Sequence, residues 1–202
     1  MSSTLPGPLQ ELVDKFSSFP GVGPKSALRM AMTLLKWPEE NARNMGRSIA
    51  ELRDNLCICS ECRTLSDCDP CSICSDPARN TGQLCIVAEW DSVLNMEEIG
   101  LYRGKYFVLG GLLSPLDGVS SQNLEFSALR RRLAGEDIQE VILALGTIME
   151  AENTGSYLRT MLENEFPDLS LTRLAQGIPV GTELKYIDRD TLRQSLEHRQ
   201  NF

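Results

Sequence analysis

The sequence predicts an α+β chain of several parts: a helical N-terminal segment, a cysteine-rich segment, an α/β segment with a mostly parallel sheet, and a short C-terminal strand and helix. Three observations predict this organisation. Apolar residues recur at helical spacing up to residue 56, while 57–80 holds six of the seven cysteines and has almost no apolar periodicity. From residue 83 onward, short apolar runs alternate with helical stretches.

The composition is that of a folded globular protein. Of 202 residues, 42% are hydrophobic and 24% are charged, which excludes a disordered or fibrous chain. No apolar run approaches the ~20 residues that a membrane-spanning helix needs, so we expect no membrane partner and a cytoplasmic location. In a reducing cytosol, closely spaced cysteines bind metal more often than they form disulfides.

We expect four domains, with boundaries at 1–56, 57–80, 81–177 and 178–202. The net charge is −8, and the excess of acid is concentrated between residues 83 and 177, which carry 7 basic and 14 acidic residues. The first domain is close to neutral, with 7 basic and 6 acidic residues. A polyanionic partner would therefore have to meet the N-terminal domain.

The N-terminal domain should contain three helices. The first is indicated by four apolar residues at helical spacing, namely Leu9, Leu12, Val13 and Phe16. Two prolines and two glycines at 19–24 then break the pattern, and a second helix follows over 24–35, with proline in its first turn. The third begins near residue 38, and its apolar stripe is Ala42, Met45, Ile49 and Leu52.

The α/β segment should form its sheet from four buried strands. These are expected at 84–88, 106–110, 140–145 and 169–174. The helices between them are expected near 91–99, 121–134 and 152–166. The C-terminal segment should add a short strand at 184–187 and a helix from 190 to about 199.

The Gly-x-Gly turn between the first two helices is a candidate DNA-binding site. Gly21 and Gly23 would place backbone N–H groups at the start of the second helix, where they can bind an anion such as a DNA phosphate. Lys25 and Arg29 lie four residues apart on one face and would reach neighbouring phosphates. Such contacts hold a backbone without reading bases. The alternative is a tight turn beside two solvated basic residues.

Four cysteines have the spacing of a structural zinc site. Cys59 and Cys62 form one Cys-x-x-Cys pair, and Cys71 and Cys74 form another. Two such pairs supply four thiolates, which select Zn²⁺ in a closed tetrahedral site. Metal binding would also order a segment that has no apolar core of its own.

Other assignments of the cysteines remain open at this point. Cys57 and Cys68 lie in the same run, and Cys68 forms a further Cys-x-x-Cys with Cys71. An iron–sulfur cluster is the main alternative to zinc, and disulfides come after it. Cys85 lies in an apolar run and is expected to be a small buried side chain.

Three glutamates follow predicted strands. Glu89 comes after the first strand, and Glu150 and Glu152 come after the third. Carboxylates at the C-terminal ends of parallel strands can hold Mg²⁺, and this arrangement resembles a Toprim domain. The alternative is that all three are ordinary solvated acids in loops.

The order of these motifs resembles the bacterial RecR family of recombination mediators, and the resemblance covers essentially the whole chain. The string at 19–31 resembles the helix-hairpin-helix of DNA repair proteins. The strings LSPLDG at 113–118 and VILA at 141–144 look like family signatures, and GIPVGTELKYID at 177–188 resembles the family's Walker B-like segment. The resemblance implies a helix-hairpin-helix, a four-cysteine zinc finger, a Toprim domain and a C-terminal segment.

The resemblance also implies a function. Members of the family form DNA-binding rings without catalytic turnover, usually homotetramers, and act with RecO and RecF to load recombinase onto gapped DNA. By resemblance, Lys25 and Arg29 would contact single- or double-stranded DNA independently of sequence, the four cysteines would hold zinc, and Glu150 and Glu152 would be the acidic pair of the Toprim fold.

One position departs from the family pattern. Ala88 stands where the family usually has the first Toprim glutamate, and Glu89 follows one residue later. Because neighbouring strand residues face opposite sides of a sheet, this shift argues against a complete catalytic Mg²⁺ site. The rival hypothesis is a Toprim-type Mg²⁺-dependent nuclease. A third hypothesis, a zinc-stabilised protein-interaction module, leaves the basic hairpin unexplained.

Overall fold

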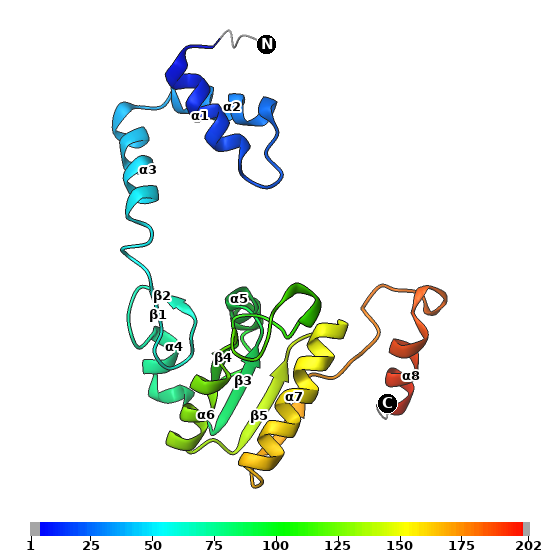
Figure 1. The fold of residues 1–202 in the computed structure, drawn as a ribbon. Helices are drawn as coiled ribbons and strands as arrows, with labels where there is room; N and C mark the ends of the chain where they lie inside the picture. Colours follow the sequence, from blue (N-terminus) through cyan, green and yellow to red (C-terminus); the bar gives the residue numbers. More distant parts are fainter. Residues whose placement is uncertain (1–4, 200–202) are drawn as a thin grey trace. The chain divides into compact units, whose positions relative to one another are not determined.

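The computed structural model describes residues 5–199, and the chain divides into two compact units, Met1–Leu56 and Cys57–Phe202 (Figure 1). The second unit contains the cysteine-rich segment, the α/β segment and the C-terminal segment. Within the described residues, no helix combines the length and the apolar character that crossing a membrane requires.

The first unit consists of α1 (Gly7–Ser17), α2 (Pro24–Leu34) and α3 (Glu39–Glu51). Val13 of α1 packs on Ala27 and Ala31 of α2, and these three buried side chains form the centre of the unit. Alanine on the inner face of α2 allows the two helices to approach closely. No residue of α3 is buried within the described chain, so its apolar stripe is at the surface.

The second unit begins with a small hairpin. Strands β1 (Cys57–Ile58) and β2 (Leu65–Ser66) pair antiparallel, and the single-turn helix α4 (Ser72–Ser75) and the 3₁₀ helix η1 (Pro77–Arg79) follow. The core of this segment is the group of four cysteines, against which Ile73 packs. Side chains other than the cysteines contribute very little apolar burial here.

A four-stranded parallel sheet follows, as the sequence predicts. Its strands are β3 (Gln83–Val87), β4 (Lys105–Val108), β5 (Glu140–Ala144) and β6 (Ser170–Arg173). Their order is β4-β3-β5-β6, and all three pairings are parallel. Ile86, next to the last residue of β3, lies beside Phe107 of β4 and Leu143 of β5.

Helices cover both faces of the sheet (Figure 1). Leu84 and Ile86 of β3 face α6 (Phe126–Gly135) and α7 (Met149–Glu165). Cys85 and Val87, which point the other way, face α5 (Trp90–Ile99). Both α6 and α7 differ from their predicted bounds at the start: α6 begins later because a turn from Ser120 to Asn123 precedes it, and α7 begins three residues earlier.

The predicted strand at 184–187 is wrong. Leu184–Tyr186 forms the 3₁₀ helix η3, with local hydrogen bonds from Tyr186 N to Glu183 O (3.0 Å) and from Ile187 N to Leu184 O (3.3 Å). Because no strand among the described residues lies beside this segment, its backbone forms local hydrogen bonds instead. Helix α8 (Arg189–Glu197) follows, and the Asp188 side chain caps it by accepting from Thr191 N at 2.9 Å.

Candidate nucleic-acid interface and metal centre

The turn between α1 and α2 requires a glycine at position 21. Gly21 has a φ of +79°, in the left-handed region that other residues avoid. Val22 N donates to Phe19 O at 3.1 Å and closes the turn. Gly21 therefore allows the sharp reversal that brings the chain from α1 into α2.

Gly23 has a different role, because its backbone conformation is ordinary. It is the N-cap of α2, with φ −80° and ψ 165°, and no side chain caps this helix. A Cβ added at Gly23 would meet nothing within 4 Å, so the backbone there is open to a ligand. The first turn of an uncapped helix leaves backbone N–H groups free, and these attract anions.

Lys25 and Arg29 lie on α2, one turn apart, and both are exposed. Within residues 5–199, neither forms an ion pair; in contrast, Lys15 and Arg43 of the same unit pair with Glu11 and Glu39. An unpaired cation can bind phosphate without first breaking an internal contact.

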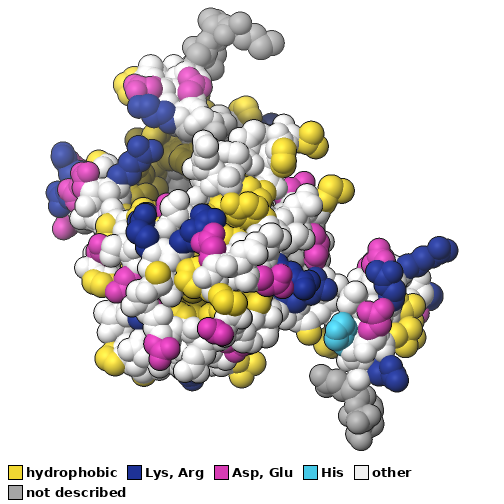
Figure 2. All heavy atoms as spheres, turned by 60° about the horizontal axis from the view of Figure 1, so that its bottom comes forward, with side chains coloured by type: hydrophobic (Ala, Val, Ile, Leu, Met, Phe, Trp, Pro, Cys, Tyr) yellow, Lys and Arg dark blue, Asp and Glu magenta, His cyan; other side chains and the backbone are white. Residues whose placement is uncertain are grey.

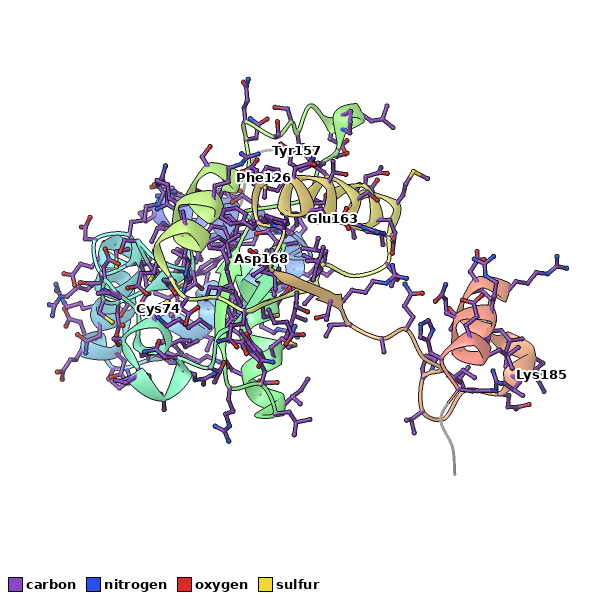
Figure 3. The ribbon with its side chains drawn as sticks, turned by 90° about the horizontal axis from the view of Figure 1, so that it is seen from below. Cys74, Phe126, Tyr157, Glu163, Asp168 and Lys185 are labelled. Carbon is purple, nitrogen blue, oxygen red and sulfur yellow. The ribbon has the colours of Figure 1, made fainter. Side chains whose placement is uncertain are left out.

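The four predicted metal ligands come together in the structure. Cys59, Cys62, Cys71 and Cys74 are each at most 6% exposed, and their sulfur atoms all lie within 4.8 Å of one another. The sulfurs of Cys62 and Cys71 are 3.5 Å apart, and Cys71 N donates to the Cys59 sulfur at 3.4 Å. Figure 3 shows Cys74 in the segment that precedes the sheet.

Local hydrogen bonds shape the first Cys-x-x-Cys pair. Arg63 has a φ of +64°, so the chain reverses directly after the second cysteine. Cys59 N donates to Thr64 O at 2.9 Å, and Arg63 N donates to Cys59 O at 3.0 Å. Ser60 N donates to a carboxylate oxygen of Asp69 at 2.7 Å and so ties this pair to the stretch that leads to the second pair.

The chemistry of the cluster fits a thiophilic cation. Burial raises the pKa of Cys71 to about 11, and the pKa of Cys74 is raised further by its hydrogen bond with Cys62 and by burial. With raised pKa values, the thiols of Cys71 and Cys74 keep their protons at neutral pH unless a cation displaces them. Four sulfur ligands in a closed site are the donor set of structural Zn²⁺.

The other three cysteines lie outside this group. Cys57 is half-buried on β1, Cys68 is exposed, and Cys85 is fully buried on β3. All seven cysteines are free thiols, so the structure contains none of the disulfides left open by the sequence.

The structure does not unite the three candidate acids into a metal site. Glu89 is the N-cap of α5, whereas Glu150 and Glu152 lie in the first turn of α7, beyond the end of β5. Glu152 is paired with Arg173 at 3.4 Å. Among the described residues, the cysteines form the only group of three or more side chains able to share a metal ion. Within the described residues, the three acids therefore do not form a group able to share a metal ion.

Family models match the chain along most of its length. A model described as RecR, helix-hairpin-helix matches residues 9–53, a Toprim domain matches 82–175, and a model described as RecR, C-terminal matches 177–200. The chain is 54% identical to Recombination protein RecR of Nitratidesulfovibrio vulgaris, and the match covers 98% of each chain. This chain belongs to the RecR family. It is also 55% identical to RecR of Maridesulfovibrio salexigens over 97% of the chain and 98% of that relative. To RecR of Porphyromonas gingivalis it is 41% identical, over 96% and 93%.

In this RecR-family chain, the cysteine segment is anchored on the Toprim domain. Val108 N at the end of β4 donates to Cys62 O at 2.8 Å. Arg63 pairs with Glu125 at 3.0 Å, just before α6. Ile73 packs against both the cysteines and the α5 side of the sheet. The metal-binding segment and the sheet thus share contacts along one edge.

Sequence reasoning missed Arg132, which is 7% exposed and lies in the last turn of α6. Arg132 follows Leu129 by three residues and precedes Leu133, both of which are buried. Its position on the apolar stripe of a helix could have indicated that Arg132 is buried, because a charged residue there must find partners in the interior.

Proposed function

We propose that this protein is a DNA-binding recombination mediator without catalytic turnover. One observation carries the proposal: the hairpin opens onto an uncapped helix, with Lys25 and Arg29 exposed and unpaired beside it. Backbone amides and two free cations recognise the phosphate backbone, which is common to all DNA sequences. The relatives' name, Recombination protein, points to the same process.

The proposal includes assembly and partners. We infer a homotetrameric ring that acts with RecO and RecF to load recombinase onto gapped DNA, in the cytoplasm at the nucleoid. Membership of the RecR family supports this role. A single hairpin offers few phosphate contacts, so a ring that presents several hairpins would bind through high effective concentration.

The metal in this proposal is structural Zn²⁺, held by Cys59, Cys62, Cys71 and Cys74. Bound zinc would order a segment that has almost no apolar core, and it would keep the edge of β4 in place through the Cys62–Val108 hydrogen bond. The separation of the three glutamates supports a role without catalysis, since two-metal phosphoryl transfer needs carboxylates grouped around Mg²⁺.

The direct test replaces both Lys25 and Arg29 by alanine. We expect DNA affinity to fall steeply and the slope of log affinity against log salt to become shallower, because two phosphate contacts per subunit are lost. Fluorescence anisotropy with gapped DNA across a salt series measures both quantities.

The matched control is Lys15→Ala with Arg43→Ala, which also removes two exposed cations from the same unit. This control should retain most of the affinity, because both side chains are already paired with glutamates. If the Lys25 and Arg29 variant remains folded and binds with unchanged affinity and salt slope, DNA binds elsewhere and the proposal fails.

A further inference from the structure

Arg132 is the most deeply buried cation among the described residues that form ion pairs. It extends from the last turn of α6 toward the cysteine segment, and its side chain is 4% exposed. Lysine and arginine are rarely buried to this degree unless their charge is compensated. The partners of this guanidinium therefore indicate what it does.

Three of its five N–H groups have identified acceptors. Nη1 donates to Tyr106 O of β4 at 2.8 Å and to Glu61 O at 3.1 Å. Nε donates to Glu136 at 3.0 Å. Glu61 lies inside the Cys59–Cys62 pair, so Arg132 contacts the backbone between two metal ligands.

The remaining nitrogen, Nη2, is buried and has no hydrogen-bond partner in the described structure. Charged donors are seldom left unpaired in a protein interior, because nothing replaces the water they lose. The other terminal nitrogen of the same guanidinium, Nη1, donates to the backbone between Cys59 and Cys62. The spare donor therefore lies on a buried side chain that contacts the cysteine segment.

The charges around Arg132 are balanced only while the cysteines are neutral. Lys105 Nζ lies 3.9 Å from Glu61 Oε2 and 3.7 Å from Glu136 Oε2. The two cations, Arg132 and Lys105, therefore face two carboxylates. Four thiolates around a divalent cation leave a net negative charge, which a buried site must offset. Arg132 is a buried cation that contacts the backbone between two of the four ligands.

We propose that Arg132 is the counter-charge of the four-cysteine metal centre, with Nη2 as the donor reserved for a thiolate. Arg132 is a positioning residue: it holds no metal itself, and it links the centre to α6 and β4. This inference rests on the proposed metal site. Groups of this kind typically change metal affinity by ~10- to 100-fold when they are replaced.

The experiment compares Arg132→Gln, Arg132→Lys and the control Arg131→Gln in the full-length protein. Arg131 is the exposed neighbour on the same helix. Competition with a chromogenic chelator measures zinc affinity. We expect Arg132→Gln to bind zinc ~10- to 100-fold more weakly, Arg132→Lys to lose less because it keeps the charge, and Arg131→Gln to match the unaltered protein.

Cobalt substitution separates this role from a purely structural one. The sulfur-to-cobalt charge-transfer band should shift in both Arg132 variants, because neither has Nη2, and should stay in place in Arg131→Gln. A merely structural arginine would lower the melting temperature equally with and without metal and leave the band unmoved. We expect the loss of melting temperature in Arg132→Gln to be larger in the metal-bound protein.

A failure of the role proposed for Arg132 can be distinguished from a failure of the proposed metal site. If the unaltered protein holds zinc and a folded Arg132→Gln or Arg132→Lys variant keeps both the affinity and the cobalt band, the role of Arg132 is overturned and the metal site stands. If zinc content is the same after Cys62→Ser, the metal site itself is wrong, and the role of Arg132 falls with it.

Discussion

At the residue scale, the two glycines of the hairpin serve different purposes. Gly21 is needed for the conformation of the chain, because its φ is +79°. Gly23 is conformationally ordinary and stands at an open helix terminus. The fold therefore requires a glycine at position 21, whereas the proposed DNA contact requires one at position 23.

This difference gives a matched pair of variants. Gly21→Ala should destabilise the helical unit by about 1 kcal/mol or more, since a side chain in left-handed geometry is strained. Gly23→Ala should leave the melting temperature nearly unchanged but weaken DNA binding, because its methyl group blocks close approach of a phosphate. Thermal unfolding and anisotropy measure the two effects. An unchanged melting temperature for Gly21→Ala would contradict the role given to its φ.

At the element scale, the four cysteines stand in for an apolar core in residues 57–80. Cys62→Ser should lower the zinc content from about one ion per chain and reduce stability markedly, since structural zinc contributes on the order of 10 kcal/mol to such segments. Cys85→Ser is the control, because Cys85 is buried on β3, outside the cluster. Metal analysis of purified protein measures the content. Equal zinc loss in the Cys85 variant would contradict the assignment.

A partly buried ion pair joins three further elements. Arg79 of η1 forms a two-pronged contact with Glu97 of α5, and the Tyr106 hydroxyl on β4 donates to the same carboxylate at 2.7 Å. The hydrogen bond from Arg79 lowers the pKa of Glu97 below its usual value. This contact therefore stabilises the corner where the cysteine segment meets the sheet.

The stability from Glu97 should depend on pH. Because the pKa of Glu97 is lower in the folded chain than in the unfolded one, its contribution is full above about pH 5 and is lost as the pH falls through the lowered pKa. Glu97→Gln should cost about 1–3 kcal/mol at pH 7 and progressively less in acid. Denaturant unfolding between pH 7 and pH 3 measures this difference. Glu98→Gln, an exposed neighbour, should show neither the cost nor the trend.

At the scale of the whole molecule, acid and base are unevenly distributed along the chain. The net charge is −8, although residues 1–56 are close to neutral. Basic and acidic side chains are interspersed on the face shown in Figure 2. A polyanion therefore gains little from the average charge of the protein and depends on local groups such as the hairpin.

Two measurements on the intact protein test the proposed role. Light scattering should give the mass of a tetramer, and DNA incubated with Mg²⁺ or Mn²⁺ should remain uncut, because the three glutamates are not grouped. A Glu150→Gln, Glu152→Gln variant is the control for cleavage. Cleavage that disappears in that variant would favour a nuclease over a mediator.

The sequence alone determined the features that depend on local chemistry. Helical spacing, the Gly-x-Gly turn and the two Cys-x-x-Cys pairs each involve residues within a few positions of one another. The parallel sheet was also predictable, because four apolar strands alternate with helices and can pack in few ways. The four cysteines could be chosen from six for the same reason, since paired spacing directs two sulfurs to one point.

The tertiary structure decided what depends on residues far apart in the chain. Glu89, Glu150 and Glu152 each follow a predicted strand, but within the described residues they do not form a group able to share a metal ion. The stretch 184–187 has strand-like composition but lacks a strand neighbour among the described residues, so its first three residues form a 3₁₀ helix instead. Arg132 reads as one of three consecutive arginines until α6 packs against the cysteine segment. Burial is a property of the packed chain, and packing alone made this arginine an internal charge.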